Sequence, residues 1–288
     1  MSERVAIIGA AGRTGLAVLR ALAARGVAPL AVTRTAKQAE SVLEAGASET
    51  TTADYASVAE LSAALEGVDR VVVIPPSYTP EHVYIANATA AAGAAGVRHL
   101  VLHSVLHPHT PTMHHHMRKA EGEAAVRAGA TPWTILQPAM YAQTVLAFAN
   151  LSPTGRICAP FNLDAPFTVT DLQDIAEITA LVLDGDEHRY ASYELVGNPA
   201  VSIREMLRLV AELRGIEAEP EQVYPWELDL PAWLREGMSD FAAMCDEYTH
   251  HGLLGNANIA RWLLGREPTP FDEVARRDLA VPLHARDR

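Results

Sequence analysis

Cysteine, basic residues and long apolar runs are all scarce in this chain. The 288 residues include two cysteines, Cys158 and Cys245, so no disulfide framework is expected and a reducing, cytoplasmic environment is the default. The formal net charge of −12 argues against nucleic acid as a partner, because phosphates require a basic surface. No apolar run approaches the ~18 residues of a membrane span, and no signal peptide is expected before the first apolar segment. These absences favour a globular protein that binds neither nucleic acid nor membrane.

A glycine-rich turn marks the point where an apolar run ends and a helical pattern begins. Residues 4–8 predict a buried strand, and leucines recur at helical spacing from residue 16 onward. In such a unit the glycines permit a sharp turn, close approach of a pyrophosphate, and close packing of helix on strand. The spacing is G-x-x-G-x-x-G, and a turn without a ligand is the alternative. The predicted phosphate-binding residues are Gly9, Ala11, Gly12, Arg13, Thr14 and Gly15.

Alternating strands and helices follow this turn. Strands are predicted at residues 29–32, 49–52, 69–74, 99–103 and 132–136, and helices at 37–45, 57–65 and around 88–95. The run from Asp69 to Ile74 is continuously apolar, which is typical of a central parallel strand covered on both faces. The pattern predicts an α/β domain over residues 1–150 and a second lobe over 151–288. A helix near 171–183 is expected to pack back on the first domain.

The end of the second predicted strand favours a particular cofactor. An acidic residue there would accept from a free 2′-hydroxyl, whereas the sequence offers Thr33, Arg34 and Lys37. This favours NADP(H) over NAD(H), the alternative being two solvated cations. Asp54, after the third strand, lies near the expected adenine position or caps the following helix.

Several candidates follow the later strands, whose carboxyl ends meet at the edge of the sheet where ligands bind. Pro75 and Pro76 end one strand and are expected beside the cofactor. Ser104 ends the next and is expected to bind the cofactor, as are Lys119 and Pro138, and to act as a hydrogen-bond donor, unless it only satisfies backbone groups. Pro138 and Tyr141 follow the sixth strand, and Tyr141 contacts a substrate or is simply packed.

A histidine-rich segment raises the question of a metal. Ordered spacing and thiol partners are lacking, so no metal is expected. The histidines are His103, His107, His109, His114, His115 and His116.

His115, Lys119 and Glu123 share one face of a predicted helix at spacing i, i+4, i+8. A hydride-transferring reductase needs a proton donor near the substrate oxygen and a cation that holds the nicotinamide ribose. His115 and Lys119 fit these roles. The alternative is a solvated Lys119–Glu123 pair with His115 incidental.

The second lobe carries weaker signals. Ser202 and Glu205 form a capping-box pattern for a helix. Leu234, Met238, Phe241 and Cys245 form an apolar stripe that favours core over a substrate pocket. The histidine pair His250 and His251 precedes Gly252, as is typical of a helix C-terminus.

These motifs together resemble the NmrA-like group of atypical short-chain dehydrogenases/reductases. The likeness includes GAAGRTG after the first strand, TR after the second, HSVLHP around Ser104 and HHxxK at His115 to Lys119. It continues through TILQPAMYAQ, the segment from Phe167 to Leu183 and LLGREPTPF. The resemblance implies a Rossmann-type doubly wound parallel sheet with a smaller, mostly helical C-terminal lobe over the cofactor, and a preference for NADP(H).

The resemblance also sets the expected function. Typical relatives carry Tyr-x-x-x-Lys, where this chain has His115-x-x-x-Lys119, and Thr144 stands where relatives often have Asn. The expected activity is NADP(H)-dependent reduction of an apolar carbonyl, quinone or enone by a monomer or homodimer. Candidate catalytic residues are Ser104, His115, Lys119 and Tyr141. The alternatives are a redox sensor that binds the dinucleotide without turnover, or a non-redox isomerase or cyclase on the same fold.

Overall fold

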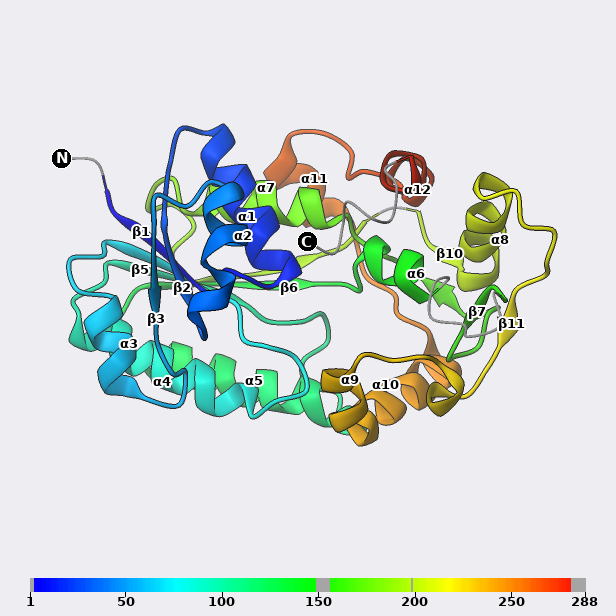
Figure 1. Ribbon diagram of the computed structural model, residues 1–288, viewed down its shortest axis with the longest axis horizontal. Coiled ribbons are helices and arrows are strands. Elements are labelled where there is room, and N and C mark those ends of the chain that lie inside the picture. The colour runs from blue at the N-terminus through cyan, green and yellow to red at the C-terminus, as the bar shows by residue number, and fades with distance from the viewer. Residues whose placement is uncertain (1–2, 149–155, 198, 281–288) are drawn as a thin grey trace. The chain divides into compact units, whose positions relative to one another are not determined.

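The first of two compact units contains a seven-stranded sheet with the order β3-β2-β1-β4-β5-β6-β9 (Figure 1). The computed structural model describes residues 3–148, 156–197 and 199–280. Neighbouring strands from β3 to β6 pair in parallel. The strands are β1 (Val5–Ile8), β2 (Leu30–Thr33), β3 (Glu49–Thr52), β4 (Arg70–Val73), β5 (His99–His103), β6 (Trp133–Pro138) and β9 (Ala191–Leu195).

Helices cover both faces of this sheet. Figure 1 shows α1, α2 and α7 on one face and α3, α4 and α5 on the other. Because the strand order reverses between β1 and β4, this is the doubly wound Rossmann-type arrangement, and the predicted fold class is confirmed. The elements are α1 (Arg13–Ala24), the 3₁₀ turn η1 (Ala36–Gln38), α2 (Ala39–Glu44), α3 (Val58–Ala64), α4 (Glu81–Ala94), α5 (His114–Ala128) and α7 (Leu172–Val182).

One hydrophobic core of this unit lies between the sheet and the helices α3 to α5. Val71 and Leu100 on the strands and Leu61 and Ile85 on the helices are at most 1% exposed. Burial of each such side chain contributes about 1.5–3 kcal/mol. A Cβ at Gly122 on α5 would lie 2.4 Å from Ile85 Cδ1, so glycine there lets α4 and α5 approach closely.

The second unit is mostly helical, as expected. Its strands are two residues long and its core contains stacked and edge-to-face aromatic rings, among them Phe161, Phe167 and Tyr248. The elements are α6 (Ala142–Phe148), β7 (Cys158–Ala159), β8 (Pro166–Phe167), β10 (Val201–Ser202), α8 (Ile203–Leu213), β11 (Glu221–Gln222), η2 (Pro225–Glu227), α9 (Ala232–Glu236), α10 (Met238–His251), α11 (Asn258–Leu264) and α12 (Phe271–Leu279).

Local predictions in this unit are largely confirmed. Ser202 caps α8 by accepting from Glu205 N in a capping box. The helix α10 ends at His251, and Gly252 follows with φ of +66°. The apolar stripe is divided between two helices, since Gly237 separates α9 from α10. Three of its four residues are buried and Met238 is half-buried, so the stripe belongs to the core.

The chain divides into two compact units, each built from several segments. The boundary predicted at residues 150 and 151 lies outside the described residues. The first unit comprises the described residues up to His109, with His115–Gln137 and Ile175–Tyr193. The second comprises Thr110–His114, Pro138–Asp174 and the described residues from Glu194. The chain leaves the first unit at the end of β6, because the segment after it pairs with residues near Thr170.

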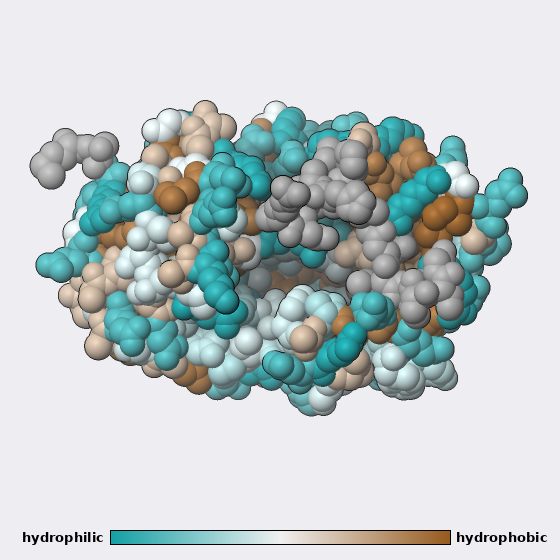
Figure 2. All heavy atoms as spheres, in the orientation of Figure 1, coloured by the Kyte–Doolittle hydropathy of each residue, from teal (hydrophilic) through white to brown (hydrophobic). Residues whose placement is uncertain are grey.

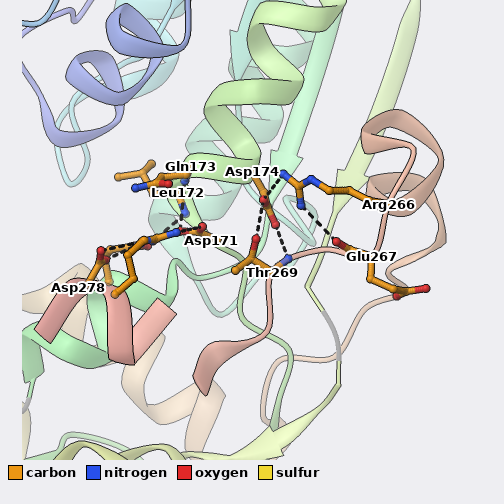
Figure 3. A network of polar contacts seen from close by, with 10 residues as sticks. Asp171, Leu172, Gln173, Asp174, Arg266, Glu267, Thr269 and Asp278 are labelled. Atoms are coloured by element: carbon orange, nitrogen blue, oxygen red, sulfur yellow. Dashed lines mark hydrogen bonds and ion pairs between the residues drawn. The ribbon is translucent and has the colours of Figure 1, made fainter. Parts of the chain in front are cut away.

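Two adjacent buried aspartates hold segments of the second unit together (Figure 3). Asp174 accepts from Arg266 Nη2 at 2.9 Å and from the Thr269 backbone N–H at 2.6 Å. Asp171 accepts from Arg277 and Gln143. Burial raises the pKa of Asp171, but these donors outweigh burial and hold the pKa below its usual value.

The viewed surface is mixed in character. Figure 2 shows hydrophilic residues over most of this face, with hydrophobic residues in separate patches. Within the described parts of the chain, no helix combines the length and apolarity needed to cross a membrane.

Candidate functional site

The predicted glycine turn connects β1 to α1. Gly9 has φ of +86°, and a Cβ there would lie 2.1 Å from the Ile74 carbonyl oxygen. A Cβ at Gly15 would lie 2.4 Å from the Gly9 and Ala10 carbonyl oxygens. A Cβ at Gly12 would meet the Gly9 oxygen at an ordinary 3.6 Å. Packing within the protein therefore requires glycine at 9 and 15, whereas at 12 it leaves room for a side chain.

Gly12 is also the N-cap of α1 and, as a glycine, offers no side-chain acceptor to the first-turn N–H groups. Gly12 and Arg13 are exposed, while Ala11 and Thr14 are half-buried. An exposed helix N-terminus with a glycine cap has the donors and the space that a pyrophosphate requires. The residues present therefore fit a dinucleotide.

Tyr55 supports this turn and was missed from the sequence. The Gly9 backbone N–H donates to the Tyr55 hydroxyl at 2.9 Å, and that hydroxyl donates to the Val32 carbonyl at 3.0 Å. The hydroxyl thus bridges the ends of β1 and β2. Burial raises the pKa of Tyr55, so the hydroxyl keeps the proton that it donates. The only sequence signal was an aromatic residue just after the third strand.

The residues predicted to read the ribose lie at the end of β2. Thr33 is buried, and its hydroxyl donates to the Thr35 carbonyl at 3.1 Å. Arg34 and Lys37 are exposed. The expected helix at 37–45 is η1 followed by α2.

Asp54 does not cap the next helix. Ser57 is the N-cap of α3, and its side chain accepts from Glu60 N. The Asp54 carboxylate instead accepts from Ala56 N at 2.9 Å in a local turn. The capping alternative is therefore wrong, and a position near adenine remains a prediction.

The loop after β4 is tightly held. Pro75 is buried and Pro76 half-buried, and the Pro76 carbonyl accepts from the Thr79 hydroxyl at 2.7 Å. Tyr78 has φ of +59°, a conformation stabilised by a 2.7 Å hydrogen bond from its N–H to Glu81. Glu81 is fully buried and pairs with Arg118 at 2.5 Å. This loop presents the Tyr78 ring toward α5.

His115 lies next to that ring. The His115 and Tyr78 ring centroids are 5.0 Å apart, and His115 is 7% exposed. The neighbouring histidines have other partners: His114 pairs with Asp240 and has a largely exposed side chain. His116 Nδ1 lies 3.0 Å from the His107 carbonyl oxygen. His115 is therefore the best placed of the three for a ligand near the β4 loop.

Lys119 lies one turn further along α5. It is buried, and its Nζ donates to the carbonyl of His103, the last residue of β5, at 3.4 Å. Burial lowers the pKa of Lys119 to about 8, while the carboxylates of Glu81 and Glu123 act to raise it. The solvated Lys119–Glu123 pair is wrong, because both residues are buried.

Ser104 and Glu123 form a further part of this cluster. The Ser104 hydroxyl donates to Glu123 Oε1 at 2.5 Å, and the Ser104 N–H donates to the Leu136 carbonyl. Glu123 also accepts from Gln137 and Arg127. The structure therefore brings together Ser104, His115 and Lys119 within the first unit.

Pro138 and Tyr141 belong to the second unit. Pro138 is buried at the end of β6, and half-buried Tyr141 forms a bridge with Thr170. Their proposed roles remain predictions.

The histidines do not form a metal site with carboxylates or thiols. Among the residues that the structure describes, no group of three or more His, Cys, Asp or Glu is arranged to hold a metal ion. Burial and the charge of Lys119 lower the pKa of His103 to about 3, and its Nε2 lies 2.9 Å from the Thr179 hydroxyl.

Known proteins resemble the chain in sequence and in fold. The (4-alkanoyl-5-oxo-2,5-dihydrofuran-3-yl)methyl phosphate reductase of Streptomyces griseus is 33% identical over 165 residues, which cover 56% of this chain and 57% of that protein. An NAD(P)H azoreductase of Xenophilus azovorans is 26% identical, covering 96% of this chain and 98% of that protein. The chain thus spans little more than half of the first relative and almost all of the second.

A solved structure shows the same fold. An NADPH-dependent quinone oxidoreductase from Escherichia coli, complexed with NADPH, has a TM-score of 0.80 at 23% identity and covers 96% of this chain and 99% of that chain. The model of the NmrA-like family matches residues 1–273. With this match over nearly its whole length, the chain belongs to the NmrA-like family.

Proposed function

We propose that this protein is an NAD(P)H-dependent reductase of the atypical short-chain dehydrogenase type. The proposal is supported by the glycine turn after β1, Ser104 after β5, and the two α5 residues His115, beside the β4 loop, and Lys119, at the end of β5. Parallel strands bring these ends to one edge of the sheet. The relatives are named as a furanone phosphate reductase, an azoreductase and a quinone oxidoreductase. These names support the same reaction class.

The residues of the cluster divide the chemical work between them. When bound, NAD(P)H supplies the hydride. His115 donates a hydrogen bond or proton to the acceptor oxygen, because its ring lies at the β4 loop with little access to water. Lys119 holds a positive charge at the end of β5. There it binds ribose hydroxyls and stabilises the negative charge that develops on the acceptor oxygen.

The cofactor preference and substrate class are finer parts of the proposal. The exposed guanidinium of Arg34 and the ammonium of Lys37 at the end of β2 suit a 2′-phosphate, so NADP(H) is preferred. Small apolar carbonyls, quinones or enones are the proposed acceptors. The protein acts in the cytoplasm as a monomer or homodimer in this proposal.

Oxidation of NADPH, followed by its absorbance, tests the function with a panel of quinones, ketones and enones. Turnover above the acceptor-free rate is expected with at least one class. Tight NADPH binding without turnover on any acceptor would favour the redox-sensor alternative.

Arg34→Ala tests the cofactor preference. Loss of the 2′-phosphate contact is expected to weaken NADPH binding ten-fold or more and to leave NADH binding nearly unchanged. Arg20→Ala is the control, because Arg20 is an exposed cation on α1 with no proposed contact to the cofactor. Equal losses for NADPH and NADH with Arg34→Ala would contradict the role of Arg34.

A further inference from the structure

Glu123 is a buried carboxylate that sets the direction in which the Ser104 hydroxyl donates its hydrogen bond. It is fully buried and accepts three hydrogen bonds, from Ser104 at 2.5 Å, Gln137 at 2.7 Å and Arg127 at 2.9 Å. Arg127 balances its charge as an ion pair one helical turn away. Buried charge of this kind is costly unless it is paired and hydrogen-bonded, and here both conditions are met.

These bonds decide what Ser104 can do for a ligand. A serine hydroxyl has one proton and two lone pairs. An ion-paired carboxylate has only acceptors, so the proton in the Ser104–Glu123 bond comes from Ser104. Ser104 can then offer a ligand only its lone pairs. It cannot at the same time donate to a substrate oxygen, which is the role that the sequence predicted for it.

The position of Ser104 indicates which part of a ligand it meets. The proposed phosphate-binding turn follows β1 and the proposed ribose-binding residues follow β2. Both lie on one side of the point between β1 and β4 where the strand order reverses, the switch point of the sheet. A dinucleotide extends across this point, so its other half lies over the ends of β4 and β5. Ser104 directly follows β5. The nearest donors of a bound dinucleotide there are the nicotinamide carboxamide N–H and the ribose hydroxyls.

We propose that Glu123 orients Ser104 as a hydrogen-bond acceptor for the nicotinamide riboside, so that Ser104 binds the cofactor and does not polarise the substrate. This inference rests on the proposed function. Glu123 is a positioning residue that acts through Ser104. Polarisation of the acceptor oxygen is left to His115 and Lys119.

Binding measurements with two reduced cofactors test the proposal. The probes are NADPH and its 3-acetylpyridine analogue, in which a methyl group replaces the carboxamide NH₂. Ser104→Ala is expected to weaken NADPH binding about five-fold or more, as loss of one hydrogen bond does, with kcat at saturating cofactor changed less than two-fold. If the analogue is unaffected, the donor is the carboxamide. If both lose affinity equally, the donor is a ribose hydroxyl, and either result supports the proposal.

Two further variants separate orientation from folding. Glu123→Gln keeps the side-chain shape, but its amide NH₂ can donate to the Ser104 oxygen. The Ser104 hydroxyl proton then no longer points to residue 123, so NADPH affinity is expected to fall as in Ser104→Ala. Ser192→Ala is the matched control, because Ser192 accepts from Arg127 and has no contact with Glu123 among the described hydrogen bonds. It should leave both affinities unchanged. Melting temperatures of all three variants show that each one folds.

The opposite division of effects would overturn the inference. If Ser104→Ala lowers kcat a hundred-fold and leaves cofactor affinity unchanged, Ser104 donates to the substrate. NADPH affinity that is indifferent to both Ser104 and Glu123 also overturns it, while the proposed function stands. Wild-type protein that binds no dinucleotide would instead overturn the proposed function.

Discussion

At the scale of single residues, three glycines in one turn have different reasons to be glycine. Gly9 and Gly15 are required because carbonyl oxygens would lie within 2.4 Å of a Cβ atom at either position, so their replacement disturbs the fold. Gly12 has ordinary space and φ of −74°, which any residue adopts. Position 12 is therefore where binding can be separated from stability.

Gly12→Ala is predicted to weaken NADPH binding at least ten-fold, because its methyl group would stand where the pyrophosphate approaches the helix N-terminus. The free energy of unfolding should change by no more than about 1 kcal/mol, the cost of a poorer N-cap. Calorimetric titration and urea denaturation measure the two quantities. Unchanged affinity would remove this turn from the cofactor site.

Lys119 is predicted to produce a pH limit on activity. Its pKa of about 8 means that it is protonated below that pH and neutral above it. Because the proposed mechanism uses the protonated form, kcat/KM should fall as pH rises through about 8. Lys119→Arg keeps a positive charge at all these pH values, so the alkaline fall should disappear from its profile. A fall of the same shape in Lys119→Arg would assign it to another group.

At the scale of elements, the hydroxyl of Tyr55 joins the ends of two neighbouring strands, β1 and β2. Tyr55 comes from the segment after β3, yet it contacts the ends of β1 and β2. The glycine turn and the ribose-reading segment therefore have a common support.

Tyr55→Phe is predicted to lower the free energy of unfolding by about 1 kcal/mol, because Val32 and Gly9 lose a buried partner. NADPH affinity should fall several-fold as the turn loosens. Tyr84→Phe is the control, since its ring packs edge-to-face on Tyr55 at 6.3 Å. Denaturation and binding curves that match for the two variants would contradict the support role of Tyr55.

At the scale of the whole molecule, the chain returns to earlier segments through buried polar contacts. Asp174 at the start of α7 binds Arg266 and Thr269, which lie far along the sequence (Figure 3). Such contacts join segments that are far apart in the sequence. They therefore contribute to the free energy of unfolding of the chain.

Asp174→Asn is predicted to lower the free energy of unfolding by about 2 kcal/mol, because it removes a buried charge that three donors stabilise and breaks the ion pair with Arg266. Glu267→Gln breaks an exposed pair with Arg261 in the same segment and should cost much less, because solvent screens exposed ion pairs. Urea denaturation of both variants measures the difference. Equal losses would show that burial does not set the strength of these contacts.

Local patterns were enough to predict the order and type of the elements in the first unit. The strands at 49–52 and 99–103 were predicted at their observed bounds, because turns and apolar runs delimit them. The shared face of His115, Lys119 and Glu123 on α5 followed from i, i+4 spacing alone, whereas its burial did not. The division of the chain into two units depends on which distant segments pair, so local patterns do not determine it.

By itself the sequence determined the alternation of strands and helices, the glycine turn and the helix face that carries His115 and Lys119, because these depend on spacing along a few residues. The tertiary structure alone decided the direction of the Ser104 proton, the support by Tyr55 and the lowered pKa of Lys119. Each of these depends on groups brought together from separate strands and helices, where burial and hydrogen-bond partners set the chemistry.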